Sequence, residues 1–169
     1  MSASGLVQID GLAPIKKEDR KTAKVMLLFP PEWVPTAPYL ALPSLTAVLR
    51  QAGHHVIQRD VNIEMYDHFF TTEFLIWVKG RLGMQLKPLQ DREKAGTLTE
   101  READQKAVVE QAYAVDVFDL GERAEDAKRI VRGERFYEAE KREGALNCFR
   151  EAMQYISAAY YPASLVFYP

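Results

Sequence analysis

One stretch near the N-terminus, residues 23–60, limits the possible folds of this chain more than any other. A short apolar run at residues 25–29 ends at two consecutive prolines, and a Pro-rich loop follows. An amphipathic segment at residues 39–52 then leads, past a single glycine, to a second strand-like run at residues 55–60. This order of strand, loop, helix and strand is typical of the opening unit of a parallel α/β sheet.

The strand and the helix of this unit have different hydrophobic patterns. Residues 25–29 are all apolar, which predicts a strand that is covered on both faces. In the helix, apolar residues recur at helical spacing and are expected on its buried side; they are Leu42, Leu45, Leu49 and Ala52. A strand covered on both faces belongs inside a layered α/β sheet, with helices on either side.

The loop after the first strand is the predicted binding region, because ligands of open α/β sheets lie beyond the carboxyl ends of the strands. Its candidate binding residues are Pro30, Pro31, Trp33, Val34 and Tyr39, with Leu42 and Pro43 at the start of the helix. Asp60 and Asn62 follow the second strand at the same edge. Each group also has a structural interpretation: prolines shape rigid loops, Trp33 can anchor packing, and Asp60 or Asn62 can cap the next segment.

The residues themselves argue against several common kinds of site. No glycine lies between Phe29 and Gly53, so the first loop has no GxGxxG fingerprint, and no GxxxxGK[ST] phosphate loop occurs in the chain. Cys148 is the only cysteine, which rules out an intrachain disulfide and a CxxC metal site; we expect it to be a small buried residue. His54 and His55 lie at the opposite end of the second strand and are interpreted as turn residues.

Charge and hydropathy narrow the possible partners. The net charge is −2, which gives no electrostatic footprint for nucleic acid. No apolar run approaches the ~20 residues that a membrane helix needs, and residues 1–22 have no signal-peptide pattern. We therefore expect a cytoplasmic protein with neither nucleic acid nor membrane as its partner. No spacing of residues supports a Ser-His-Asp or Cys-His catalytic set.

The remainder of the chain is predicted to be mostly helical. We expect an apolar helix at residues 72–81, a linker at residues 84–97, and a helix from Thr99 to about residue 119, opened by a capping box between Thr99 and Glu102. The strongest helical pattern spans residues 134–160, and one of its faces carries Leu146, Phe149, Met153 and Ile156.

These patterns divide the chain into four parts: a flexible leader at 1–22, a β-α-β unit at 23–70, a helical extension at 71–162, and an extended tail or short strand at 163–169. A doubly wound sheet needs several parallel strands, joined by crossovers of about a dozen residues or more. The chain offers two strands, with residues 165–168 as at most one more. We therefore expect the front of a larger α/β domain, unless the helices cover a minimal sheet or another chain completes it.

Residues 24–60 also resemble a known family. The two prolines after the first strand, the Tyr-Leu-Ala-Leu-Pro sequence at 39–43, Gly53 after the helix and Asp-Val-Asn at 60–62 are similar to the N-terminal cobalamin (B12)-binding domain of cobalamin-dependent radical S-adenosylmethionine enzymes. The sequences at 130–133 and 156–163 are similar to a subgroup of the same family. The resemblance covers most of the chain after Lys24, but only the front part of a full-length member, before the radical barrel.

The resemblance implies a partial flavodoxin-like or Rossmann-like domain that binds cobalamin at the carboxyl edge of its sheet. In cobalamin mutases and methionine synthase, a His in a DxHxxG motif of the first loop ligates cobalt, but residues 31–43 contain no His. The loop would therefore supply no lower ligand. Trp33, Val34 and Tyr39 would instead form an apolar wall beneath the corrin.

The family's radical chemistry lies outside this chain. A [4Fe–4S] cluster is held by Cys thiolates, in the CxxxCxxC motif of this family, and one cysteine is not enough. We therefore expect the cluster and S-adenosylmethionine to bind a downstream radical polypeptide or domain, which is the expected partner, and we expect no catalysis by this chain alone. The alternative is a non-enzymatic α/β scaffold or interaction domain, whose helices at about residues 99–160 dock a partner.

Overall fold

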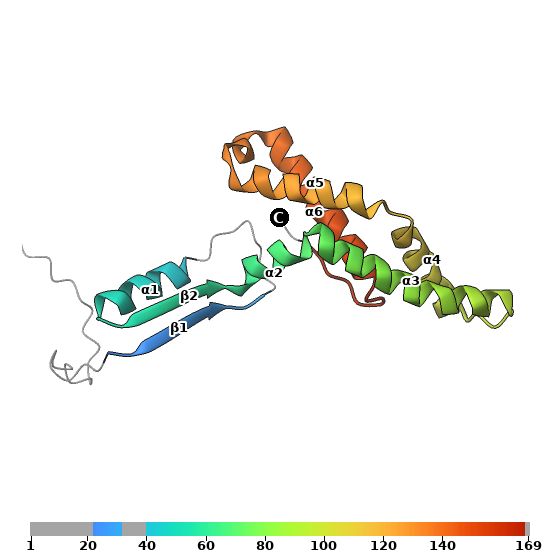
Figure 1. Cartoon of the computed structure of the whole chain (residues 1–169), viewed down its shortest axis with the longest axis horizontal. Helices are drawn as coiled ribbons and strands as arrows, with labels where there is room; N and C mark the ends of the chain where they lie inside the picture. The colour runs from blue at the N-terminus through green and yellow to red at the C-terminus, as the bar shows by residue number, and fades with distance from the viewer. Residues whose placement is uncertain (1–21, 32–39, 168–169) are drawn as a thin grey trace, which may run out of the picture. The chain divides into compact units, whose positions relative to one another are not determined.

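The computed structural model describes residues 22–31 and 40–167, and the chain forms two compact units (Figure 1). The first unit holds strand β1 (Lys24–Phe29) except for its last residue, helix α1 (Ala41–Gln51), and strand β2 (His55–Asp60) up to Arg59. The second contains the residues from Asp60 onward, with the remaining helices, together with residues 29–31. The protein is thus mixed α/β but mostly helical.

The first unit has the predicted order of strand, helix and strand. β1 and β2 form a parallel two-stranded sheet, and the backbone N–H of His55 donates to the carbonyl of Ala23 at 2.9 Å where the two strands begin. Gly53, with a φ of 89°, turns the chain from α1 into β2, a backbone conformation that glycine adopts at little cost. The parallel β-α-β expectation is therefore confirmed.

Helix α1 covers the sheet with a narrower face than its sequence predicts. Leu42 and Thr46 are buried, and the Thr46 hydroxyl donates to Gln58 Oε1 of β2 at 2.9 Å. The expected burial of Leu45 is wrong, because its exposed fraction is 52%. Two strands give the helix too little surface to bury a full apolar face, so only the row formed by residues i and i+4 meets the sheet.

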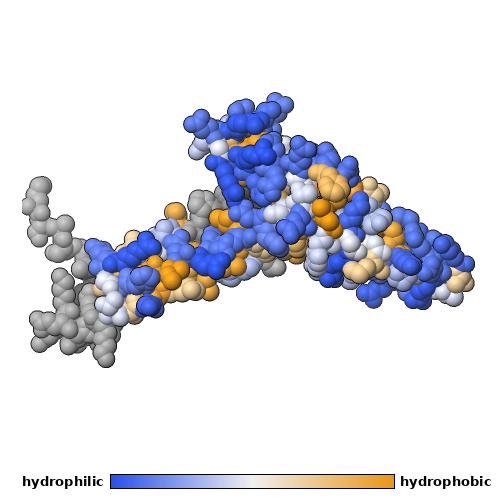
Figure 2. Space-filling view, viewed as in Figure 1, coloured by the Kyte–Doolittle hydropathy of each residue, from blue (hydrophilic) through white to orange (hydrophobic). Residues whose placement is uncertain are grey.

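Only one face of β1 is covered, so the expectation of a strand covered on both faces is also wrong. Met26 and Leu28 are 57% and 56% exposed, whereas Val25 and Leu27 are half-buried. Neighbouring side chains on a strand point to opposite faces, and α1 lies on the face that carries Gln58. The space-filling view shows apolar surface over this part of the chain (Figure 2).

The second unit is a set of helices around one core. They are α2 (Val61–Phe69), α3 (Thr72–Lys94), α4 (Glu100–Tyr113), α5 (Val117–Arg132), the 3-10 helix η2 (Glu134–Tyr137) and α6 (Ala139–Ala158). α3 pairs with α4 as a helical hairpin, and α5 packs against both α6 and α3 (Figure 1). The largest fully buried side chains here include Phe70, Leu75, Leu82, Leu120 and Ile156.

Helix α3 extends well beyond its predicted end. Residues 84–97 were expected to form a linker, but α3 continues through Gly83 and Pro88 to Lys94. Leu82, Leu86 and Leu89 are buried along one side of it, while Pro88 is exposed. Burial of this stripe outweighs the roughly 3 kcal/mol that a proline costs inside a helix.

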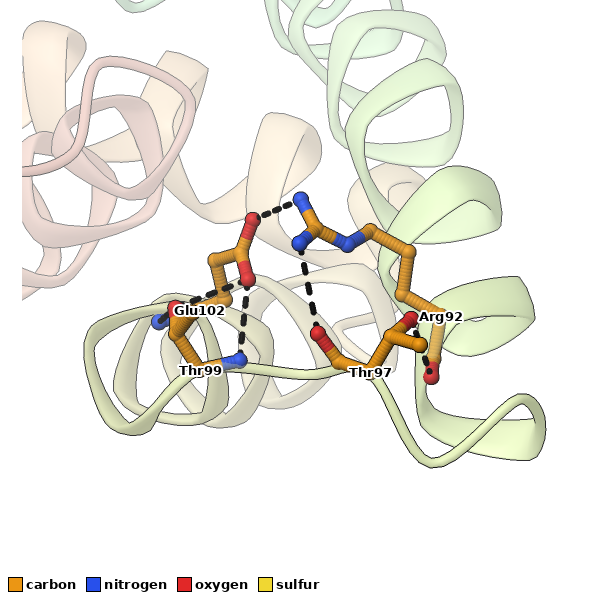
Figure 3. A network of polar contacts seen from close by, with 4 residues as sticks. All are labelled: Arg92, Thr97, Thr99 and Glu102. Carbon is orange, nitrogen blue, oxygen red and sulfur yellow. Dashed lines mark hydrogen bonds and ion pairs between the residues drawn. The ribbon is translucent and has the colours of Figure 1, made fainter.

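The predicted capping box at the start of α4 is confirmed, and it belongs to a larger polar network (Figure 3). The backbone N–H and the hydroxyl of Thr99 both donate to Glu102 Oε2, at 3.0 and 2.7 Å. Arg92 of α3 forms an ion pair with the same carboxylate and donates to the carbonyl of Thr97 at 3.2 Å. These hydrogen bonds, above all those from Thr99, lower the pKa of Glu102.

The helix that starts at Thr99 is shorter than predicted. It was expected to reach about residue 119, but α4 ends at Tyr113 and a new helix, α5, begins at Val117. The carboxylate of Asp116 accepts hydrogen bonds from the backbone N–H groups of Phe118 and Asp119, at 3.0 and 3.2 Å. Asp116 is therefore the N-cap of α5.

The apolar stripe predicted at residues 134–160 is confirmed on α6, where its members are buried: Leu146, Phe149, Met153 and Ile156. No third strand forms among residues 165–167, the described part of the possible strand. The Ser157 hydroxyl bonds both backbone groups of Leu165 instead, donating to its carbonyl at 3.1 Å and accepting from its N–H at 2.7 Å. Phe167 is buried in the helical core.

Helix α5 approaches the start of α3 closely at Gly121. A Cβ added there would lie 2.9 Å from Thr72 Cβ of α3, whereas a Cβ at Gly144 of α6 would meet nothing within 4 Å. We expect Gly121→Ala to destabilise the protein by about 1 kcal/mol, since overpacking costs more than the gain in helix propensity. The matched variant Gly144→Ala should stabilise it by up to about 1 kcal/mol. Urea unfolding followed by circular dichroism measures both, and a stabilising Gly121→Ala would contradict the close approach.

Candidate functional site

The predicted binding region begins where β1 ends. Pro30 and Pro31 directly follow β1, and both are exposed. Neither has a backbone N–H, so neither can extend the strand pairing. Trp33, Val34 and Tyr39 lie outside the described residues, and their predicted role as an apolar wall remains a prediction.

Asp60 ends β2 and caps the helix that follows. Its Oδ1 accepts a hydrogen bond from the backbone N–H of Ile63 at 3.0 Å, and its backbone is extended, with φ −99° and ψ 90°. Of the two interpretations open from the sequence, a cap or a ligand contact, the structure contains the cap. The ligand contact remains a prediction.

Asn62 is the second residue of α2 and one of the most deeply buried polar side chains, with an exposed fraction of 2%. Asn at that depth carries an amide that must be matched by polar partners inside the protein. Direct contact between a ligand and this amide would require the residues that cover it to move.

The two candidates on α1 have different positions. Leu42 is buried, with an exposed fraction of 6%, and packs as a core residue of the first unit. Pro43 is exposed in the first turn of α1, where a missing N–H leaves no helical hydrogen bond unmade. Of this pair, Pro43 is the residue that has free surface for a ligand.

Two of the histidines, His54 and His68, make local contacts. His54 accepts a hydrogen bond at Nδ1 from the backbone N–H of Ala23 at 3.3 Å, which joins the turn after α1 to the start of β1. The ring of His68 lies 4.9 Å from that of Phe74. Within residues 22–31 and 40–167, no group of three or more His, Cys, Asp or Glu side chains is placed to hold a metal ion.

Cys148 is buried among the helices of the second unit, as its sequence context predicted. Burial raises the pKa of its thiol, against a smaller opposing effect of the positive charge on Arg123. Arg123 forms a two-point contact with Glu151, at 2.7 and 2.9 Å, and a third ion pair with Asp119 at 2.8 Å. The hydrogen bond from Arg123 lowers the pKa of Glu151. A thiol with a raised pKa is a poor nucleophile, so Cys148 has a packing role.

Sequence reasoning missed a pocket on the second unit. It lies among α2, α5, η2, α6 and the segment after α6, and it is lined by Ile63, Tyr66, Asp67, Phe70, Lys128, Val131, Arg132, Phe136, Phe149 and Phe167. Its five aromatic residues come from segments that lie up to about a hundred residues apart in the chain. No periodicity within one helix could have indicated that they meet.

Comparison with models of known protein families, with curated proteins and with solved structures found no match to this chain in any of the three. Among the described residues, no helix combines the length and the apolar composition needed to cross a membrane.

The role of Asp60 can be tested by two substitutions that differ only in capping. Asp60→Ala removes the acceptor for the Ile63 N–H, and we expect it to lower stability by about 1 kcal/mol. Asp60→Asn keeps an acceptor of the same shape and should cost much less, because Asn caps helices as well as Asp does. Thermal unfolding followed at 222 nm measures both. Equal losses in the two variants would mean that the carboxylate charge, rather than the cap, is what stabilises the protein.

Proposed function

We propose that this chain is a cobalamin-binding module that forms the front of a larger α/β domain. The parallel strand–helix–strand unit carries this proposal, because it has the topology of an open sheet whose ligands bind beyond the strand ends. The resemblance of residues 24–60 to cobalamin-binding domains of radical S-adenosylmethionine enzymes indicates which ligand this would be, cobalamin. The proposal rests on the topology and on that resemblance together.

The residues at this edge fit the lower face of a corrin that lacks a nitrogen ligand from the protein. Pro30 and Pro31 are exposed and uncharged, and residues 31–43 contain no His that could reach cobalt. Trp33, Val34 and Tyr39 would add apolar surface beneath the ring. The cobalamin supplies the organometallic chemistry, while this chain would bind and orient it and would keep water from its lower face.

The catalytic partner of this module would be a radical S-adenosylmethionine polypeptide or domain. Among the described residues, the sheet consists of β1 and β2 alone, and the edge of a sheet can accept further strands. We propose that the partner supplies these strands together with the cysteine ligands of the [4Fe–4S] cluster, since Cys148 is single and buried.

A titration with hydroxocobalamin tests this proposal. We expect the protein to retain corrin after desalting, with an absorbance spectrum that lacks the signature of a nitrogen lower ligand. Trp33→Ala and Tyr39→Ala should each weaken retention by about tenfold, because each removes an aromatic contact with the corrin. His54→Ala is the control and should leave affinity and spectrum unchanged, since its ring faces the opposite end of the strands.

Two results would contradict the proposal. The first is retention that none of the loop substitutions alters, which would place the corrin elsewhere. The second is a spectral change in His54→Ala, which would make that imidazole a cobalt ligand. A failure to retain any corrin would contradict binding by this chain alone.

A second candidate function, a protein-interaction scaffold, is favoured by a different observation. Met26, Leu28 and Ile57 lie on the sheet face opposite α1 and are 57%, 56% and 44% exposed. A contiguous exposed apolar patch on a protein commonly marks an interaction surface. This function needs no cofactor, and the open sheet face would be its docking surface.

The open face can be tested with the double variant Met26→Lys/Leu28→Lys. Because both side chains are exposed, we expect its melting temperature to stay within about 2 °C of the wild-type value. We expect sedimentation velocity to show concentration-dependent association of the wild-type protein and to show none for the variant. A double substitution on the exposed surface of α4, Ala103→Lys/Ala107→Lys, adds the same two positive charges and is the control. A wild-type protein that stays monomeric at every concentration would argue against an adhesive sheet face.

A further inference from the structure

The pocket on the second unit has a floor of stacked aromatic rings. Phe70 and Phe149 lie parallel, with ring centroids 4.4 Å apart and planes at 8°. Phe167 packs edge-on against Tyr66 at 5.7 Å and lies 5.6 Å from Phe149. Phe70, Phe149 and Phe167 are all at most 5% exposed. The floor is therefore fixed by ring contacts from α2, α6 and the segment after α6.

Three charged residues line the pocket, Asp67, Lys128 and Arg132, and each of the two cations is paired with a carboxylate. Arg132 forms an ion pair with Asp67. Lys128 Nζ donates to Glu125 Oε1 at 2.8 Å and, at a longer 3.4 Å, to the backbone carbonyl of Asp67. An ammonium has three N–H donors, so Lys128 retains one donor beyond these two contacts.

The size of the pocket limits what it can hold. Its volume is about 290 Å³, at the lower end of the range for small-molecule sites. Val131, Phe136 and Ile63 complete its walls, so seven of the ten lining residues are aliphatic or aromatic. A corrin is far larger than this space, and the pocket is therefore not the cobalamin site proposed above.

We propose that this pocket binds a small, flat apolar molecule that bears one anionic group. The aromatic rings of the lining would contact the flat body of the ligand, and the anionic group would lie at Lys128, near Arg132. Lys128 is the better anchor, because its side chain is only 12% exposed and ionic hydrogen bonds strengthen away from water. This inference is independent of cobalamin binding.

Two dyes with the same aromatic body test the proposal: 8-anilinonaphthalene-1-sulfonate, which carries an anion, and N-phenyl-1-naphthylamine, which does not. In fluorescence titrations we expect Lys128→Met to weaken binding of the sulfonate about tenfold and to leave binding of the neutral dye unchanged. Arg129→Met is the matched control, since Arg129 lies next to Lys128 on α5 but does not line the pocket; it should change neither affinity.

A third variant tests the location. Ile63 is 44% exposed at the wall of the pocket, so Ile63→Trp should fold and fill the pocket, and both dyes should lose saturable binding. Unchanged affinity of both dyes in Ile63→Trp would overturn the proposal, as would equal losses of both dyes in Lys128→Met. A wild-type protein that binds neither dye would also overturn it. Should Lys128→Met not fold, Arg132→Met removes the other cation of the lining and gives the same comparison.

Discussion

The packing of α5 against α6 is the contact on which the second unit depends. Small buried residues make it possible: Ala124 and Ala127 on α5, with Ala145 and Ala152 on α6. Short side chains let helix axes approach closely, and Gly121 brings α5 against the start of α3 in the same way. The segment after α6 packs into the same core, where Phe167 completes the floor of the aromatic pocket.

The first unit, in contrast to the second, buries little apolar surface. Two parallel strands and one helix bury Leu42 and Val56 well, but they leave Met26, Leu28 and Leu45 more than half exposed. Parallel sheets normally have both faces covered. Both proposed functions would cover this exposed surface. In the first, a partner adds further strands to the cofactor-binding domain, and in the second, a partner protein docks on the open sheet face.

The sequence predicted local features well where the signal is a backbone hydrogen bond or a run of like residues. The Thr99–Glu102 box and the apolar stripe on α6 were both confirmed. The predicted linker at residues 84–97 was wrong, because Pro88 lies inside α3. The predicted single helix from Thr99 to about residue 119 was also wrong, because Asp116 caps a new helix there. In the candidate site, the sequence could name Asp60 but could not decide between a cap and a ligand contact, because both use the same carboxylate.

The sequence alone determined the parallel strand–helix–strand order, the turn at Gly53, and the burial of Cys148, because each depends on neighbours in the chain or on strong apolar character. Only the tertiary structure decided how much of α1 and β1 is buried, since that depends on how many strands share the sheet. It also decided the aromatic pocket, where Tyr66, Phe149 and Phe167 meet from distant parts of the chain. Contacts between distant segments are set by the packing of whole helices, and no local pattern in the sequence records them.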